Sequence, residues 1–117
     1  MQLEQRIVGD VAVVKVTGDI TLNKGGDVLI KDKVQSLLQQ GHTKLLLDLS
    51  GVSYVDSAGL GELVQAYATT KNKGGALKLQ GVGKRLRDLL VVTKLLTVFD
   101  TYDTEAEAIA SFGAAAH

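Results

Sequence analysis

The stretch Lys44-Leu45-Leu46-Leu47-Asp48-Leu49 is a compact apolar run of strand length. A strand with so little alternation between apolar and polar residues is expected in the middle of a sheet that is covered on both faces. Helix-like and strand-like segments alternate on either side of it. The stretch therefore predicts an α/β fold with a mostly parallel sheet.

Two strand-like runs precede this central strand. Residues 3–8 form a short, weaker one, and residues 11–17 read Val-Ala-Val-Val-Lys-Val-Thr, a β-branched run. Gly9-Asp10 lies between them, and a two-residue polar gap containing glycine favours a hairpin. We expect the hairpin to add one antiparallel edge to the sheet.

The hydrophobic pattern then changes to a helical period over residues 24–40. Gly41 is well placed to end this helix in a left-handed conformation. The predicted inner face consists of Ile30, Val34, Leu37 and Leu38.

Downstream of the central strand the alternation repeats. A second helix is expected over residues 57–72, a short strand over 76–80 and a third helix over 84–92. Their inward-facing helical residues are predicted to be Leu60, Leu63, Val64, Tyr67, Leu86, Leu89 and Leu90.

The C-terminal part is interpreted as one more strand and one more helix, about four helices in all. Residues 95–99 are expected to form a last, edge-like strand. Thr104 and Glu107 match a capping box for a helix that ends near Phe112. The tail, residues 113–117, is expected to fray.

Length and composition indicate one soluble domain, residues 1–117. The chain has no cysteine, which excludes disulfides and thiolate-bound metals and fits a reducing cytosol. Thirteen basic and thirteen acidic residues leave no net charge to steer the chain onto nucleic acid or an anionic membrane. No apolar run of about 18 residues and no signal peptide are evident. We expect a cytoplasmic protein.

The most informative segment lies at the expected start of the second helix. Asp56 or Ser57 could be its N-cap, because both side chains can accept hydrogen bonds from first-turn amides. Gly59 and Gly61 follow, and a glycine inside a helix costs about 1 kcal/mol relative to alanine. Two such losses in one turn indicate that a neighbouring strand or a partner protein approaches the backbone closely.

Two interpretations of Ser57 are open at this point. It is only a cap, which the local pattern by itself favours, or it is modified. A phosphate would add a charge of about −1.5 to −2. The positive end of the helix dipole would tolerate that anion, while Asp56 would disfavour it.

The segment Val55-Asp56-Ser57-Ala58-Gly59-Leu60-Gly61-Glu62-Leu63 resembles the signature of STAS domains, specifically bacterial anti-sigma factor antagonists. Further matches occur in order elsewhere, and the resemblance spans about residues 3–112. The resemblance therefore favours the interpretation that Ser57 is modified over the interpretation that it is only a cap. The supporting segments are Thr17-Gly18-Asp19-Ile20, Leu46-Leu47-Asp48-Leu49, Gly74-Gly75-Ala76-Leu77-Lys78-Leu79, and residues 84–95 followed by Val98-Phe99.

The resemblance implies a non-enzymatic switch that needs no cofactor or metal. The expected partner is an anti-sigma factor with serine kinase activity. It binds the unmodified form of this protein and thereby releases a sigma factor. After the partner has phosphorylated Ser57, the two proteins no longer bind. A metal-dependent serine phosphatase restores the active form. The protein itself is expected to be a monomer or weak dimer.

The resemblance also implies roles for individual residues. Asp56, Ser57 and Ala58 would lie at the contact surface, Gly59 and Gly61 would allow close approach, and Glu62 would lie on the exposed face. Ala58 stands where many relatives have a second hydroxyl residue. Thr21 belongs to the expected partner surface, although residues 21–27 lack the early acidic residue of well-studied sporulation-type members.

Other functions are also considered. The fold could instead serve as a constitutive scaffold or accessory module of a signalling or transport complex, without phosphorylation. Gly81-Val82-Gly83-Lys84-Arg85 lacks the spacing of a phosphate-binding loop and is interpreted as a turn, which makes nucleotide binding a distant third possibility. The two histidines, His42 and His117, are expected at the surface, not in catalysis or metal binding.

Overall fold

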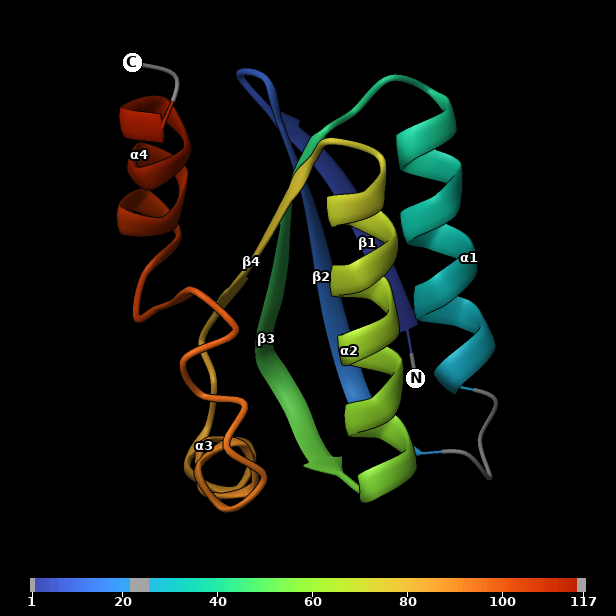
Figure 1. Ribbon diagram of the computed structural model, residues 1–117, viewed down its shortest axis with the longest axis vertical. Coiled ribbons are helices and arrows are strands. Elements are labelled where there is room, and N and C mark those ends of the chain that lie inside the picture. The colour runs from blue at the N-terminus through green and yellow to red at the C-terminus, as the bar shows by residue number, and fades with distance from the viewer. Residues whose placement is uncertain (1, 22–25, 116–117) are drawn as a thin grey trace.

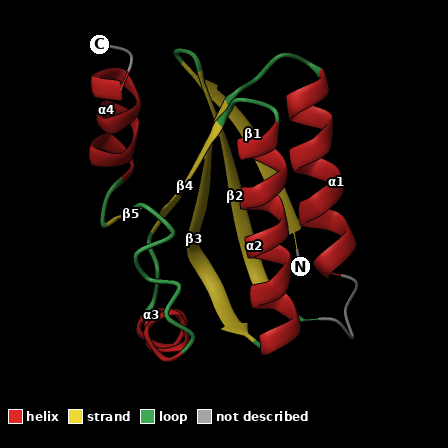
Figure 2. Ribbon diagram, viewed as in Figure 1, coloured by secondary structure: helices red, strands yellow, loops and turns green. Residues whose placement is uncertain are grey.

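A computed structural model describes residues 2–21 and 26–115. Its strands form one five-stranded sheet in the order β1-β2-β3-β4-β5, in which β1 and β2 are antiparallel and all other neighbours are parallel (Figures 1 and 2). This confirms the predicted α/β fold with its N-terminal antiparallel edge. The elements are β1 (Gln2–Val8), β2 (Val11–Ile20), α1 (Gly26–Gln39), β3 (Lys44–Val55), α2 (Ser57–Asn72), β4 (Ala76–Gln80), α3 (Lys84–Val92), β5 (Thr101–Tyr102) and α4 (Glu105–Ala115).

The predicted hairpin is present. Val8 pairs with Val11, so Gly9 and Asp10 form a two-residue loop. Gly9 has φ +62° while Asp10 does not have a positive φ, as in a type II′ turn. The left-handed conformation predicted for Gly41 is also found, with φ +94°.

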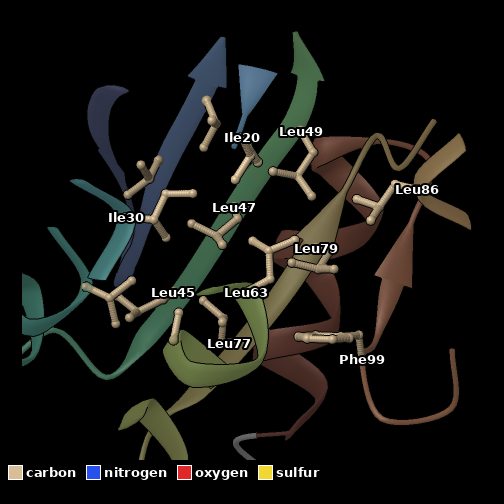
Figure 3. Packing of buried hydrophobic residues seen from close by; sticks show 14 of the residues in the cluster. Ile20, Ile30, Leu45, Leu47, Leu49, Leu63, Leu77, Leu79, Leu86 and Phe99 are labelled. Atoms are coloured by element: carbon tan, nitrogen blue, oxygen red, sulfur yellow. The ribbon is translucent and has the colours of Figure 1, made fainter. Parts of the chain in front are cut away.

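The central strand β3 is covered on both faces, as its apolar sequence predicted. Leu45, Leu47 and Leu49 point into the larger core cluster, which α1, α2 and α3 help to build (Figure 3). Leu46 points to the opposite face, where α4 covers it with Ala108 and Phe112. In Figure 1, α1 and α2 lie side by side, and α4 stands apart from them across the sheet. The buried helical residues include Ile30, Val34, Leu37, Leu60, Leu63, Leu86 and Leu90.

The segment predicted as a last strand is not one. Residues 95–99 form turns, and the strand that pairs with β4 is Thr101–Tyr102. The apolar side chains of this segment pack on the core without forming a strand. Phe99, for example, is buried, and its ring centre lies 5.3 Å from that of Tyr67. Lys94, directly before this segment, has φ +62°, and the amide of Leu95 donates to Leu90 O at 2.8 Å.

Other boundaries differ in length. β3 was expected to end at Leu49, but it continues to Val55 because residues 51–55 pair with the end of β2. α4 runs to Ala115, beyond the predicted end at Phe112, so residues 113–115 continue the helix; Ala114 and Ala115 are strong helix formers. Residues 116 and 117, like 24 and 25 at the expected start of α1, lie outside the described residues.

Candidate functional site

Asp56 is the N-cap of α2. Its backbone is extended, with φ −94° and ψ −179°, and its Oδ1 accepts a hydrogen bond of 2.7 Å from the amide of Gly59. The carbonyl oxygen of Asp56 accepts the first intrahelical bond, from Leu60 N at 2.9 Å. Of the two possible caps, the structure therefore selects Asp56, and Ser57 is the first residue of the helix.

Ser57 is exposed, and its hydroxyl has no hydrogen-bond partner within residues 2–21 and 26–115. The amides of Ser57 and Ala58 belong to the first turn, where no intrahelical acceptor is available. Only the third amide, that of Gly59, is used by Asp56. The first turn contains no acidic residue. Within residues 2–21 and 26–115 the amides of Ser57 and Ala58 have no hydrogen-bond acceptor. An anion on the Ser57 oxygen would thus meet these two amides and the positive end of the helix dipole.

Gly59 accounts for one of the two unusual glycines. It is buried against the end of β2, and a Cβ atom built on it would lie 2.0 Å from the carbonyl oxygen of Ile20. The amide of Asp56 also donates to this oxygen, at 3.4 Å. The close approach at Gly59 is therefore made by a neighbouring strand of the same chain.

Gly61 differs from Gly59. It is exposed, and a Cβ atom at this position would meet nothing within 4 Å. Together with the exposed Ser57 and Ala58 it forms a small open surface, which we call the Ser57 patch. Nothing in the packing of the described chain demands a glycine at position 61.

The other predicted site residues flank the Ser57 patch with less exposure. Asp56 is half-buried by its capping role, and Thr21, directly after β2, is only 9% exposed. Glu62 was expected on the exposed face, but it is half-buried and its Oε2 atom is inaccessible to solvent. The loop that follows Thr21, residues 22–25, lies outside the described residues.

A groove of about 240 Å³ lies beside the C-terminal end of β3. The last residues of β3, Ser53 to Val55, form one wall, and Gly83 to Leu86 at the start of α3 form the other. The Arg85 guanidinium lies 5.9 Å from the centre of the Tyr54 ring, which is 42% exposed. The groove ends two residues before Ser57.

Comparison with known proteins identifies the family. Residues 2–108 match the family model of the STAS domain. The chain belongs to the STAS-domain family.

Curated relatives of this STAS domain carry a shared functional name. An anti-sigma-B factor antagonist of Bacillus subtilis is 35% identical over 88 residues, which cover 70% of this chain and 80% of the relative. The anti-sigma-B factor antagonist of Listeria monocytogenes is 33% identical over 85 residues, 69% of this chain and 75% of that one. A crystal structure of a Thermotoga maritima protein has a TM-score of 0.84 at 27% identity, and the match covers 93% of this chain and 92% of that one. These antagonists are regulators that act by binding, and this STAS domain is not an enzyme.

The sequence did not reveal the groove beside this STAS domain's β3. The apolar run that predicts this strand ends at Leu49, so Tyr54 lies outside the predicted strand. The signal was nevertheless present, because Val52, Tyr54 and Val55 are strong β-formers that resume directly after Gly51. Lys84, Arg85 and Arg87 in the first turn of α3 are all exposed.

Other kinds of site find little support in the described residues. His42 is half-buried in the turn after α1, and His117 lies outside the described part. Across residues 2–21 and 26–115, no three His, Cys, Asp or Glu side chains come close enough together to hold a metal ion. None of the helices in the same part of the chain is long and apolar enough to cross a membrane.

Proposed function

We propose that this STAS domain is an anti-sigma factor antagonist that phosphorylation of Ser57 switches off. In its unmodified form it binds an anti-sigma factor with serine kinase activity, and the sigma factor held by that partner becomes free to direct transcription. The kinase then transfers the γ-phosphoryl group of ATP to the Ser57 oxygen, and the complex separates. The switch operates in the cytoplasm.

The observation that carries the proposal is the exposed Ser57 hydroxyl at the first position of α2. Because Asp56 performs the capping, Ser57 is not needed to hold the helix start together. The Ser57 oxygen is accessible, and its hydroxyl does not cap the helix. Relatives of this chain are named anti-sigma factor antagonists. Together these observations support Ser57 as the phosphoacceptor. Ala58 leaves it without a neighbouring hydroxyl that could compete.

The position also explains how a phosphate could block binding and leave the fold intact. The free amides of Ser57 and Ala58 would offset part of the added charge, while Asp56 would oppose it. A dianion on the Ser57 patch would, however, have to be desolvated when a partner covers it. Burying an unpaired charge is costly, so a partner whose surface offers no cation to pair with the phosphate dissociates.

The proposed partner surface is centred on the Ser57 patch. Ser57, Ala58 and Gly61 would contact the partner directly. Because Gly61 has no side chain, the partner could approach the helix backbone closely at this position. Thr21, Asp56, Gly59 and Glu62 are more buried, and we propose that they shape the surface from beneath and at its margin. A metal-dependent serine phosphatase acting on phospho-Ser57 would restore binding.

The test uses the purified chain with the anti-sigma factor kinase from the same organism. With ATP, we expect one phosphate on Ser57 by peptide mass spectrometry and none on Ser57→Ala. Isothermal titration calorimetry should show binding by the wild type and Ser57→Ala, and no binding by Ser57→Asp. Treatment of the phosphorylated chain with the phosphatase should restore the wild-type affinity.

Ser36→Asp is the matched control, because Ser36 is also an exposed helical serine but lies on α1. It should bind normally, which would show that the position of the charge matters. Retained binding by a folded Ser57→Asp would overturn the switch and favour the constitutive scaffold. Circular dichroism and thermal melting establish that each variant is folded.

A further inference from the structure

β1 is an edge strand of the sheet, and its outer edge has no strand partner within the described residues. β1 is the first strand in the sheet order and, in the described part of the chain, its ladder partner is β2 alone. No other backbone hydrogen bond of residues 2–21 and 26–115 involves β1. Such an edge presents unpaired N–H and C=O groups to any strand that can align with it.

Side chains of β1 alternate between the two faces of the sheet. Leu3 packs against the larger core cluster on the α1–α2 face, and residues 5 and 7 share that face. Arg6 pairs with Val13 and Glu4 with Lys15, so these two side chains lie on the α4 face. Ile7 is 48% exposed, which is high for a residue of its size.

A second copy can pair with this edge only in certain registers. Two antiparallel β1 strands related by a two-fold axis must place the axis on a residue, because directly opposed side chains share a face. With the axis on Gln5, Glu4 of one copy faces Arg6 of the other, twice. On the opposite face Leu3 faces Ile7, also twice. Axes on Glu4 or Arg6 lose both matches.

We propose that two copies of this protein associate through their β1 edges in the register centred on Gln5, forming a continuous ten-stranded sheet. Charged residues on an edge strand ordinarily discourage pairing. Here their signs alternate so that the strand is complementary to itself. The exposed Ile7 gains an apolar partner in the same register.

Arg6 is able to serve both partners. It already forms an ion pair with Glu105 at the start of α4, and its side chain is 52% exposed. A guanidinium has five donors, so Glu105 and the second copy's Glu4 can flank it together. Glu4 is exposed and has no ion-pair partner within the described residues.

The dimer should be weak. Seven residues of edge pairing make a small interface compared with those of stable dimers. Lys33 donates to the Gln5 side chain at 3.4 Å, so two Lys33 ammonium groups would approach the axis. The Ser57 patch follows β3, two strands away from the edge, and would stay accessible in the dimer.

The test compares single charge reversals with their mixture by sedimentation equilibrium at high protein concentration. Glu4→Lys and Arg6→Glu should each weaken dimerisation more than about tenfold, since each places like charges opposite one another twice. Mixed together the two variants should associate again. The lysine introduced at position 4 then faces the glutamate introduced at position 6, and the unchanged Arg6 of one variant faces the unchanged Glu4 of the other. Native mass spectrometry should show the mixed dimer and little of either homodimer.

Several results would overturn the proposal. They are a monomeric wild type at all concentrations, association unchanged by Glu4→Lys, or failure of the mixture to restore it. Unchanged association would locate the contact elsewhere, for example at the exposed Val91 and Val92 of α3. If Arg6→Glu does not fold, Ile7→Asp tests the same register from the other face and should also weaken dimerisation.

Discussion

At the scale of single residues, two glycines with the same helical setting have opposite structural roles. Gly59 is required because the carbonyl of Ile20 occupies the place of its missing side chain. Gly61 follows two positions later in the helix and faces open space. Helix propensity treats the two alike, so their difference arises only from contact with β2.

This difference gives a matched pair of variants. Gly61→Ala should raise the free energy of unfolding by about 0.5–1 kcal/mol, because alanine loses less backbone entropy in a helix. Gly59→Ala should lower it by more than about 2 kcal/mol, since the start of α2 must move away from Ile20. Urea unfolding of both variants measures the two effects. Equal changes in the two variants would contradict the close packing of Gly59 on β2.

At the scale of elements, the β1–β2 hairpin is linked to the start of β3 by an ion pair. Lys44 Nζ lies 2.5 Å from Asp10 Oδ2 in the hairpin turn. The hydrogen bond from Lys44 lowers the pKa of the Asp10 carboxyl below its ordinary value of 3.8. The folded state therefore holds the proton of Asp10 less tightly than the unfolded state.

The sign of the pH dependence follows from this lowered pKa. The contribution of Asp10 to stability should be complete above the unfolded pKa, near 4, and should disappear as the pH falls through the lower folded pKa. Lys44→Met should thus be less stable than the wild type at pH 7, and this difference should shrink on acidification. Thermal melting between pH 7 and pH 2 measures it. In an Asp10→Asn background the effect of Lys44→Met should lose this pH dependence.

At the scale of the whole molecule, α4 closes the second face of the sheet. Phe112 is buried there with Val11, Val13 and Leu46. Lys78 on β4 is only 8% exposed; its Nζ lies 2.9 Å from Ser111 Oγ and 4.7 Å from the centre of the Phe112 ring. Arg6 adds an ion pair from β1 to Glu105. The helix is thus held by an apolar anchor and by polar contacts with two strands.

The apolar anchor should dominate. Phe112→Ala should lower the free energy of unfolding by about 3–5 kcal/mol, the usual cost of removing a buried phenylalanine side chain. Phe112→Leu keeps most of the volume and should cost less than half as much. Denaturant unfolding compares the two. A small effect of Phe112→Ala would mean that α4 contributes little to the stability of the sheet.

Elements whose pattern is local could be predicted from the amino-acid sequence. Helices α2 and α3 and strand β4 have the predicted bounds, because each is defined by its own periodicity and by neighbouring turn residues. The capping role of Thr104 was found in the same way: the amide of Glu107 donates to Thr104 Oγ1 at 3.2 Å. The Glu107 carboxylate accepts from the Thr104 hydroxyl at 3.0 Å and not from the Thr104 amide, so the reciprocal half of the predicted capping box is replaced by a side-chain contact. Ser57 was likewise singled out from its place before an apolar stripe and its resemblance to a known motif.

Features that depend on residues far apart in the chain could not be predicted in this way and are set by contacts in the folded protein. β3 extends to Val55 because β2 is there to pair with it, and residues 95–99 turn because Phe99 packs on Tyr67. Asp56 rather than Ser57 is the cap because the end of β2 holds its amide and admits Gly59. A local sequence pattern cannot predict such a neighbour, because the energy of each contact depends on two segments that are distant in the sequence. That neighbour is what leaves the Ser57 hydroxyl free.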